Sequence, residues 1–384
     1  MEMRFLFTAI RGSGHVRPLL PYAHSLRARG HEVRVATPLD AAEMLAAEGL
    51  DHVVTPRASD EVLRDFWASK GEISNDQMVA IAIPELFVGI SARYALPRLQ
   101  AQIEEWRPDF VVRESAEFAA PVAAECAGIP CITVEVHNGP VECELFRLAA
   151  PAMDKLRAEA GLVADEGAAL RRLPGFSAFP ASFDNAVRPV DSPDRVRVRS
   201  AALQEPDMDA LPSWRKRPVK PFVYASFGTV ADKKSIAVYR AAAEALGGLD
   251  VEGLLTTGPH VDPEALGPVP ANVSVRQFVP QAEVFGHADV VLCHGGSGTL
   301  VGALSAGKPL IVVPLFADQP DNAARVDQLG LGLAVADRET KPIREALGRV
   351  LADRTFSSRA ADVMIEMAAL PSVERATELL ETVE

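Results

Sequence analysis

The sequence has few of the residues and patterns that mark secreted, metal-binding or membrane-embedded proteins. Its 384 residues include only four cysteines, none of them in a C-x-x-C pair: Cys126, Cys131, Cys143 and Cys293. We therefore expect reduced cysteines rather than a disulfide or zinc framework. No apolar run approaches the roughly 20 residues of a membrane span. The first ten residues lead directly into a turn, too soon for a signal peptide. These features predict a cytoplasmic protein with no membrane partner.

Basic residues are also in the minority. The chain has 39 Lys and Arg against 52 Asp and Glu, a net charge of -13. This balance disfavours nucleic acid and anionic membranes as partners. A chain of 384 residues is too long for one typical hydrophobic core, so we expect two domains.

Strand-like apolar runs alternate with helix-like segments in both halves of the chain. The predicted strands are 4–10, 32–37, 109–113, 130–135, 222–226, 251–256, 273–276, 289–293 and 309–314. This alternation predicts an α/β protein with two doubly wound parallel sheets. Of the long intervening segments, 57–105 is predicted to be mostly helical and 138–190 irregular.

A composition shift separates the two halves. Residues 204–221 carry four prolines among scattered charges, which is typical of an interdomain linker. We therefore predict an N-terminal domain at 1–203 and a C-terminal domain at 222–362.

Two glycine-rich turns follow predicted strands, one in each half. Gly12-Ser-Gly14-His15 follows the first strand, and His294-Gly-Gly-Ser-Gly298 follows strand 289–293 and leads into a predicted helix. Glycines let a backbone approach a ligand and free its N–H groups for an anion. The second turn therefore predicts a phosphate cradle, with a tight structural turn as the alternative. Doubly wound sheets bind ligands beyond their carboxyl strand ends, so the two turns are candidates for one site.

Two other chemistries fit the pattern less well. Gly12-Ser-Gly14 begins like a dinucleotide-binding fingerprint, but Arg17 holds the third glycine position and Pro18 follows. This mismatch disfavours a nicotinamide cofactor. Asp207-Met-Asp209 has the spacing found in metal-dependent sugar transferases, but it lies in the predicted linker. No histidine pair has metal-ligand spacing on a helix, so we predict no metal site.

His15 is the candidate general base, because a histidine after a strand and a glycine turn is poorly placed for core packing. The remaining histidines outside the cradle are interpreted as structural: His24, His31, His52, His137, His260 and His287.

With both turns placed, the sequence resembles the GT-B glycosyltransferases. It is most similar to the bacterial enzymes that decorate antibiotics and other polyketides, which are relatives of the UDP-glycosyltransferases. Four motifs in family order carry the resemblance, with Gly14-His15 as a fifth: Ser226-Phe-Gly-Thr229, Phe278-Val-Pro-Gln281, His294-Gly-Gly-Ser-Gly-Thr299 and Phe316-Ala-Asp-Gln-Pro-Asp-Asn322. The match spans essentially the whole chain and is weakest at 57–105 and 138–190. It implies two Rossmann-like domains facing a central cleft, with helices at 363–384 packing back towards the N-terminal domain.

The resemblance also implies a role for each motif. The implied contacts with a nucleotide sugar are Phe278 and Val279 at the nucleobase; Ser226, Thr229, His294, Gly296, Ser297, Gly298 and Thr299 at the diphosphate; and Asp318 and Gln319 at the sugar. His294 and the helix N-terminus would together compensate the leaving diphosphate in place of a metal ion. His15 would deprotonate the acceptor hydroxyl.

Two further positions refine the expectation. The family often orients its base with an aspartate after an N-terminal strand, where this chain has Glu114. Glu117 is the alternative, and a carboxylate that only complements a helix dipole is the structural interpretation. UDP-sugar relatives hold the ribose with a glutamate eight residues after the motif histidine, where this chain has Gly302. That absence suits a dTDP-sugar better than a UDP-sugar.

The sequence thus predicts an inverting, metal-independent glycosyltransferase that needs no cofactor. It would move a sugar, such as a deoxysugar, from a dTDP-sugar to a hydrophobic acceptor such as a polyketide. A GT-B sugar-nucleotide epimerase and a non-catalytic sugar-nucleotide-binding helper remain open. The identity of the acceptor, the choice between O- and C-glycosylation, and whether the protein forms a homodimer also remain open.

Overall fold

The structure is a computed structural model that describes residues 2–184, 195–200, 220–228 and 235–381. The chain divides into a first unit, Met1–Val198 with Pro371–Glu384, and a second unit, Arg199–Leu370. Thr229, Asp207-Met-Asp209 and the predicted linker up to residue 219 lie outside the described residues. The division assigns residues 363–370 to the second unit, so only the segment from Pro371 belongs with the first.

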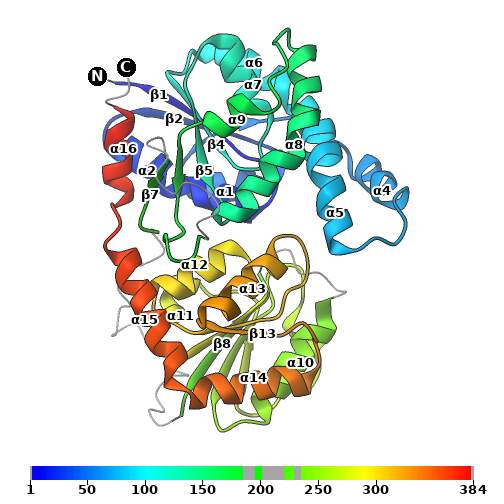
Figure 1. The fold of residues 1–384 in the computed structure, drawn as a ribbon, viewed down its shortest axis with the longest axis vertical. Coiled ribbons are helices and arrows are strands. Elements are labelled where there is room, and N and C mark those ends of the chain that lie inside the picture. Colours follow the sequence, from blue (N-terminus) through cyan, green and yellow to red (C-terminus); the bar gives the residue numbers. More distant parts are fainter. Residues whose placement is uncertain (1, 185–194, 201–219, 229–234, 382–384) are drawn as a thin grey trace. The chain divides into compact units, whose positions relative to one another are not determined.

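The first unit contains a parallel sheet with strand order β3-β2-β1-β4-β5-β6-β7. Its strands are β1 (Arg4–Thr8), β2 (Glu32–Thr37), β3 (Asp51–Val54), β4 (Phe110–Glu114), β5 (Cys131–Glu135), β6 (Gly175–Ser177) and β7 (Arg195–Arg197). Its helices are α1 (Ser13–Val16), η1 (Arg17–Leu19), α2 (Leu20–Ala28), η2 (Leu39–Ala41), α3 (Ala42–Ala47), α4 (Asp60–Ala68), α5 (Asn75–Ile81), η3 (Ala82–Ala92), α6 (Arg93–Trp106), α7 (Ala119–Ala127), α8 (Gly139–Glu159), α9 (Ala168–Arg172) and α16 (Val373–Leu380). Alternate β1 residues enter different cores, Leu6 on one face and Phe5 and Phe7 on the other. Helices therefore cover both faces (Figure 1).

The second unit contains a parallel sheet with strand order β10-β9-β8-β11-β12-β13. Its strands are β8 (Phe222–Ser226), β9 (Glu252–Thr256), β10 (Val273–Arg276), β11 (Val290–Cys293), β12 (Leu310–Val312) and β13 (Gly332–Ala334). Its helices are α10 (Ile236–Gly247), η7 (Pro263–Leu266), α11 (Gln281–Phe285), α12 (Ser297–Ser305), α13 (Gln319–Leu329), α14 (Thr340–Ala352) and α15 (Arg354–Ala368). All five residues of β8 and all four of β11 are buried, as expected for central strands covered on both faces.

Both sheets reverse their winding direction once, and the candidate residues lie at those reversals. In the first sheet the reversal falls between β1 and β4, where Thr8 pairs with Arg113. In the second it falls between β8 and β11, where Ser226 pairs with Cys293. Connections leave such neighbouring strands in opposite directions and open a crevice at their carboxyl ends. His15 follows β1, Glu114 is the last residue of β4, and His294 follows β11.

The predicted doubly wound α/β architecture is confirmed, with corrections in detail. The apolar strands are present to within a few residues, but β3, β6, β7 and β13 were missed because they are short or partly exposed. Residues 138–190 are not mainly irregular, because α8 is a continuous 21-residue helix. Asn138 caps this helix through Val141, and Pro140 occupies its first turn, where proline is tolerated.

One helix of the first unit is long and apolar enough to cross a membrane. It runs without interruption from Asn75 to Trp106 through α5, η3 and α6. This corrects the expectation that no apolar stretch approaches that length. A single helix selected by length and composition is weak support for a membrane span, because core helices of soluble proteins meet the same criteria.

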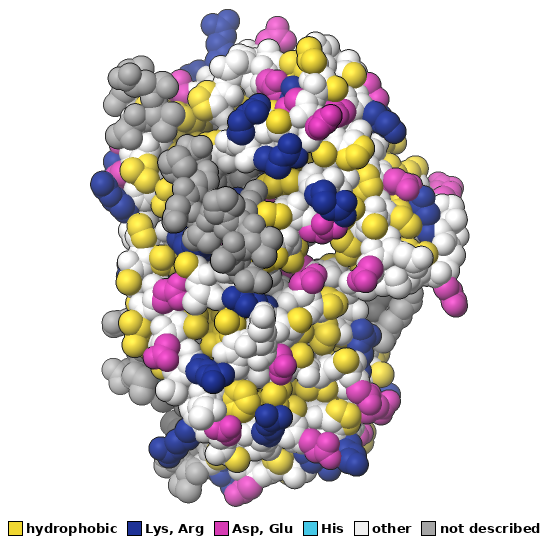
Figure 2. Space-filling view, viewed as in Figure 1, with side chains coloured by type: hydrophobic (Ala, Val, Ile, Leu, Met, Phe, Trp, Pro, Cys, Tyr) yellow, Lys and Arg dark blue, Asp and Glu magenta, His cyan; other side chains and the backbone are white. Residues whose placement is uncertain are grey.

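The C-terminal helix α16 packs on the first unit beside α2 (Figure 1). Thr377 and Ser25 share a buried hydrogen bond of 2.7 Å, and Glu381 accepts two hydrogen bonds from Arg29. On the face of the molecule drawn in Figure 2, acidic and basic side chains are interspersed rather than gathered by sign.

Candidate active site

A histidine–carboxylate pair lies at the carboxyl edge of the first sheet. Gly12, with φ of 110°, turns the chain after β1 so that the short helix α1 carries His15 back towards β4. His15 Nδ1 lies 3.0 Å from Glu114 Oε2. The carboxylate accepts this hydrogen bond, so the hydrogen resides on Nδ1 and Nε2 is left able to accept a proton. About a quarter of the His15 side chain is exposed, whereas Glu114 is fully buried.

The protein holds Glu114 in its ionised form. Burial raises its pKa, but the His15 charge and hydrogen bond, the Ala116 N–H and Arg113 together lower it below the ordinary glutamate value. Ala116 N donates to Glu114 at 2.7 Å and Ile10 N at 3.3 Å. An ionised carboxylate on Nδ1 would stabilise the imidazolium that forms when Nε2 takes a proton.

Glu117, the alternative partner, has a different position. It accepts hydrogen bonds from Thr8 Oγ1 at 3.1 Å and from the backbone of Ala119 and Ala120 at the start of α7. Burial raises its pKa. Glu117 therefore fixes the beginning of α7, and Glu114 is the carboxylate against His15.

A second histidine–carboxylate pair lies at the same edge and was missed in the sequence. His137 follows β5, and its Nδ1 lies 3.2 Å from Oε1 of the fully buried Glu142. Ser115 donates to the same oxygen, and Val136 N donates to Ser115 Oγ at 3.0 Å. This pair could have been found in the sequence, because His137 and Glu142 lie five residues apart on either side of a helix start.

His294 occupies a narrow space between two glycines of the second unit. A Cβ on Gly228 would lie 2.7 Å from His294 Nε2, and a Cβ on Gly296 would lie 2.4 Å from it. Any larger residue at either position would cover this nitrogen. Burial lowers the pKa of His294 to about 4, against the opposing effects of the Asp318 carboxylate and a Ser226 backbone group. The ring is therefore neutral near pH 7.

The helix that follows His294 offers backbone donors. Helix α12 begins at Ser297 after Gly296, and no side chain caps its N-terminus. The N–H groups of Ser297, Gly298 and Thr299 have no carbonyl partner within the helix. With the helix dipole they form a region that favours an anion.

Two of the hydroxyl groups assigned to the diphosphate lie within hydrogen-bond distance of one glutamine. Gln281 Nε2 lies 3.3 Å from Ser226 Oγ, 3.2 Å from Thr299 Oγ1 and 3.3 Å from the Tyr224 hydroxyl. Both Ser226 and Thr299 are buried. Gln281 therefore joins β8, α11 and α12, a role that its place in the sequence motif did not indicate.

The loop before α13 positions Asp318 and Gln319. Ala317 has φ of 56°, an uncommon conformation for a residue with a side chain and one often found at functional sites. Asp318 Oδ2 accepts from Ser297 Oγ at 3.1 Å and from Asn322 Nδ2 at 2.9 Å. Gln319 is buried, and its side-chain oxygen accepts from the backbone of Leu315 and Phe316. In this state Gln319 supports the loop, and its contact with a sugar stays a prediction.

Phe278 and Val279 lie beyond the carboxyl end of β10. Phe278 is 60% exposed, which is unusual for an aromatic side chain and leaves its ring available for a planar partner. Val279 is half-buried beside it.

Gly302 has a packing role of its own. A Cβ at this position would lie 2.4 Å from Cε2 of Phe285, whose buried ring also contacts Tyr224 edge-on. A carboxylate at 302 has no room beside this ring. The glycine is thus explained without reference to a ribose, so it does not by itself distinguish dTDP from UDP.

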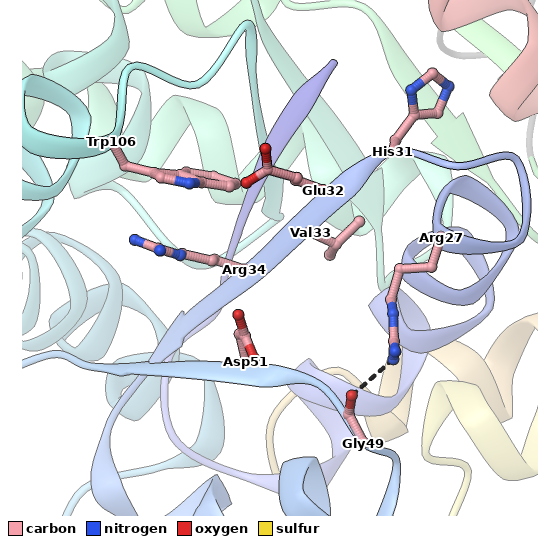
Figure 3. A pocket seen from close by; sticks show the side chains of 8 residues that line it. All are labelled: Arg27, His31, Glu32, Val33, Arg34, Gly49, Asp51 and Trp106. Carbon is pink, nitrogen blue, oxygen red and sulfur yellow. Dashed lines mark hydrogen bonds between the residues drawn. The ribbon is translucent and has the colours of Figure 1, made fainter. Parts of the chain in front are cut away.

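The cavity in Figure 3 lies away from these residues. It is lined by residues at the starts of β2 and β3, such as Glu32 and Asp51, with Arg34 stacked 4.6 Å from the centre of the Trp106 ring. This is the amino edge of the first sheet, opposite to His15. Across the described part of the chain, no three His, Cys, Asp or Glu side chains form a group that could hold a metal ion.

Comparisons with known proteins identify the family of this chain. Residues 24–142 match the N-terminal domain, and residues 240–383 the C-terminal domain, of the family described as erythromycin biosynthesis protein CIII-like. L-demethylnoviosyl transferase of Streptomyces niveus is 29% identical over 87% of this chain and 85% of its own length. The NDP-glycosyltransferase YjiC of Bacillus subtilis is 26% identical over 96% of this chain and 94% of its own.

Solved structures share the whole architecture. The glycosyltransferase SnogD from Streptomyces nogalater has a TM-score of 0.77 and 28% identity, covering 100% of this chain and 99% of its own. The Streptomyces glycosyltransferase SsfS6, complexed with thymidine diphosphate, has a TM-score of 0.79 at 24% identity, with 100% of both chains covered.

Proposed function

Since this chain belongs to the erythromycin biosynthesis protein CIII-like family of GT-B glycosyltransferases, we propose that it transfers a sugar from a dTDP-sugar to a hydroxyl group of a hydrophobic natural product. The reaction inverts the anomeric centre and uses no metal ion or other cofactor. The observation that carries this proposal is the His15–Glu114 pair, with Nδ1 and Oε2 3.0 Å apart at the reversal point of the first sheet.

The acceptor side of the reaction depends on His15. Its Nε2 removes the proton of the acceptor hydroxyl as the oxygen attacks the anomeric carbon. The bond between this carbon and the diphosphate oxygen breaks, and its electron pair leaves with dTDP. Attack from the opposite face converts an α-linked donor into a β-linked product. Glu114 stabilises the imidazolium and preserves the tautomer between turnovers.

The donor side depends on His294 and the start of α12. A neutral His294 donates a hydrogen bond from Nε2, beside the gap that Gly228 and Gly296 leave, to a diphosphate oxygen. The N–H groups of Ser297, Gly298 and Thr299 and the Ser226 hydroxyl complete the site, and the sequence motif assigns Thr229 to the same diphosphate. Such fixed donors stabilise the charge that develops on the leaving group. Phe278 and Val279 contact the nucleobase, and Asp318 and Gln319 the sugar.

The choice of donor and acceptor class rests on relatives. The relatives include demethyllactenocin mycarosyltransferase of Streptomyces fradiae and elloramycin glycosyltransferase ElmGT of Streptomyces olivaceus. SsfS6 was crystallised with thymidine diphosphate. No described residue favours the epimerase or the non-catalytic helper, and the His15–Glu114 pair fits neither as well as it fits proton removal from an acceptor.

The direct test is turnover with defined substrates. The protein is mixed with 7-hydroxycoumarin and either dTDP-glucose or UDP-glucose, with and without a chelator. We expect a coumarin glucoside by mass spectrometry, a β-anomeric proton by NMR, higher kcat/KM with the dTDP donor, and no effect of the chelator. Epimerised donor without a glucoside, or activity that chelator abolishes and Mg²⁺ restores, would contradict the proposal.

A further inference from the structure

An arginine is buried completely behind the candidate base. Arg113 precedes Glu114 on β4 and has no exposed surface. Its Nε donates to the Glu114 carbonyl at 2.9 Å, and its Nη2 donates to the Ser115 carbonyl. The guanidinium lies 5.5 Å from the centre of the Phe118 ring and 6.0 Å from that of Phe146. Both rings belong to the apolar core on this face of the sheet.

This arginine is costly for a purely structural residue. Among the described residues its guanidinium pairs with no carboxylate, and its Nη1 has no hydrogen-bond partner. Burying an unpaired charge destabilises the fold, and apolar residues of similar volume often serve stability equally well. The apolar part of the side chain would fill this space as a methionine does. Filling space therefore does not explain why this position has a charged guanidinium group with several N–H donors.

The two backbone contacts act on the turn that carries Glu114. Arg113 holds the carbonyls of Glu114 and Ser115, the two residues at which β4 ends and the turn towards α7 begins. Glu114 orients His15, and Ser115 donates to Glu142, the partner of His137. One guanidinium thus anchors the turn from which both histidine–carboxylate pairs are held.

The charge of Arg113 also acts on Glu114. Three charged groups lie around Glu114 and interact with it: His15 from α1, Arg113 from β4 and Glu117 before α7. Glu142 of α8 contacts the next residue, Ser115. Burial raises the pKa of Glu114, and Arg113 is one of the groups that lower it. Without the positive charge of Arg113, the repulsion between the Glu114 and Glu117 carboxylates would no longer be offset.

We propose that Arg113 is a positioning residue for the base: its guanidinium fixes the turn that bears Glu114, so that this carboxylate orients His15. The positive charge of Arg113 acts in the same direction, because it favours the ionised form of Glu114. This inference rests on the proposed function, because it needs His15 to act as the base. It adds to the reaction a residue that touches neither donor nor acceptor.

The first test is a double-mutant cycle on kcat with dTDP-glucose and 7-hydroxycoumarin. Arg113→Lys keeps the charge but loses the two-pronged contact with the carbonyls. We expect it to lower kcat roughly tenfold, since small misplacements of catalytic groups are costly. In a Glu114→Gln background the same substitution should change kcat by less than about twofold, because Arg113 acts through Glu114. Equal factors in both backgrounds, or an unchanged kcat, would overturn the proposal.

Arg157→Lys is the matched control. Arg157 is also buried, and it contacts Glu125 and the Val163 carbonyl between α8 and α7, among residues to which no catalytic role is assigned. This variant should lower Tm by a similar amount while keeping kcat. A matching loss of kcat in Arg157→Lys would assign the effect of Arg113→Lys to general destabilisation and overturn the proposal.

The second test isolates the charge. In Arg113→Met the pKa of Glu114 should rise, so the acidic limb of the kcat profile should move to higher pH, whereas Arg113→Lys should keep the limb in place. An unchanged limb in Arg113→Met would overturn the electrostatic part. If Arg113→Met does not fold, the cycle with Arg113→Lys decides. His15→Ala distinguishes the proposed function from the role of Arg113. Full activity of His15→Ala would contradict the proposed function. If His15→Ala is inactive and Arg113→Lys keeps the kcat of the unmodified protein, only the inference about Arg113 is contradicted.

Discussion

His15 and His294 both follow a central strand next to the reversal point of its sheet, yet their surroundings differ in charge. His15 contacts a buried, ionised carboxylate and keeps part of its ring exposed. His294 touches glycine backbones, and burial lowers its pKa to about 4. The first arrangement favours a ring that accepts a proton, and the second a neutral ring that donates a hydrogen bond. The same topology thus supports two different chemistries through what lies beside each ring.

The largest expected effect is the loss of turnover when the His15 side chain is removed. His15→Ala removes the only proposed proton acceptor, so kcat should fall by roughly 10²–10⁴, the usual range for general-base assistance. The affinity for dTDP, measured by calorimetry, should stay within about twofold. Turnover close to that of the unmodified protein would assign His15 a structural role.

His294→Ala tests whether the His294 ring donates a hydrogen bond to the diphosphate. The imidazole contact strengthens as charge develops on the diphosphate, so kcat should fall by roughly 10²–10³, and dTDP should also bind more weakly. Calorimetry and steady-state kinetics on the same preparation test both changes. If neither quantity changes, His294 lies outside the donor site.

The pKa of His294 predicts a moderate pH effect on donor binding. A diphosphate beside the ring raises its pKa, and a shift from about 4 to roughly 6 would make dTDP-glucose bind about fourfold more tightly at pH 5.5 than at pH 7.5. Without donor, the pH dependence of folding stability has the opposite sign to that of donor binding. The unfolded chain then binds more protons, so the free energy of unfolding falls as pH drops from the ordinary histidine value towards 4. The matched variant His294→Ala should lose both dependences; a dTDP-glucose affinity that is flat with pH in the unmodified protein would show that the ring does not meet the diphosphate.

The smallest effect concerns Gly302 and is expected in stability. Glycine to alanine in a helix usually stabilises it by up to about 1 kcal/mol. At Gly302 the added Cβ would meet the Phe285 ring at 2.4 Å, so we expect a loss of about 1–3 kcal/mol in urea unfolding instead. Phe285→Leu should restore part of this loss. Gly298→Ala is the control on the same helix, because its Cβ would meet nothing within 4 Å. If Gly302→Ala proves as stable as Gly298→Ala, the packing explanation is wrong.

The sequence predicted the elements that depend on local pattern. The apolar runs at β8 and β11 mark central strands, and the glycine turns after β1 and β11 mark the carboxyl ends of strands next to the reversal points. It did not predict short strands such as β7, whose two arginines pair with Glu135 and Asp184 far along the chain. The choice of Glu114 over Glu117 was open because the two residues lie only three positions apart at the end of β4. Gln281, His137 and the Phe285–Gly302 contact depend on tertiary neighbours, which no spacing in the sequence specifies.

The most direct measurement of the central claim is a comparison of the unmodified protein with His15→Ala across a series of phenol acceptors of decreasing pKa. A base is needed less as the acceptor hydroxyl becomes more acidic. If His15 removes the acceptor proton, the ratio of the two kcat/KM values should fall steadily along the series and approach one for phenols that are ionised at the assay pH. A ratio that stays constant across the series would show that His15 contributes to the reaction without taking the proton.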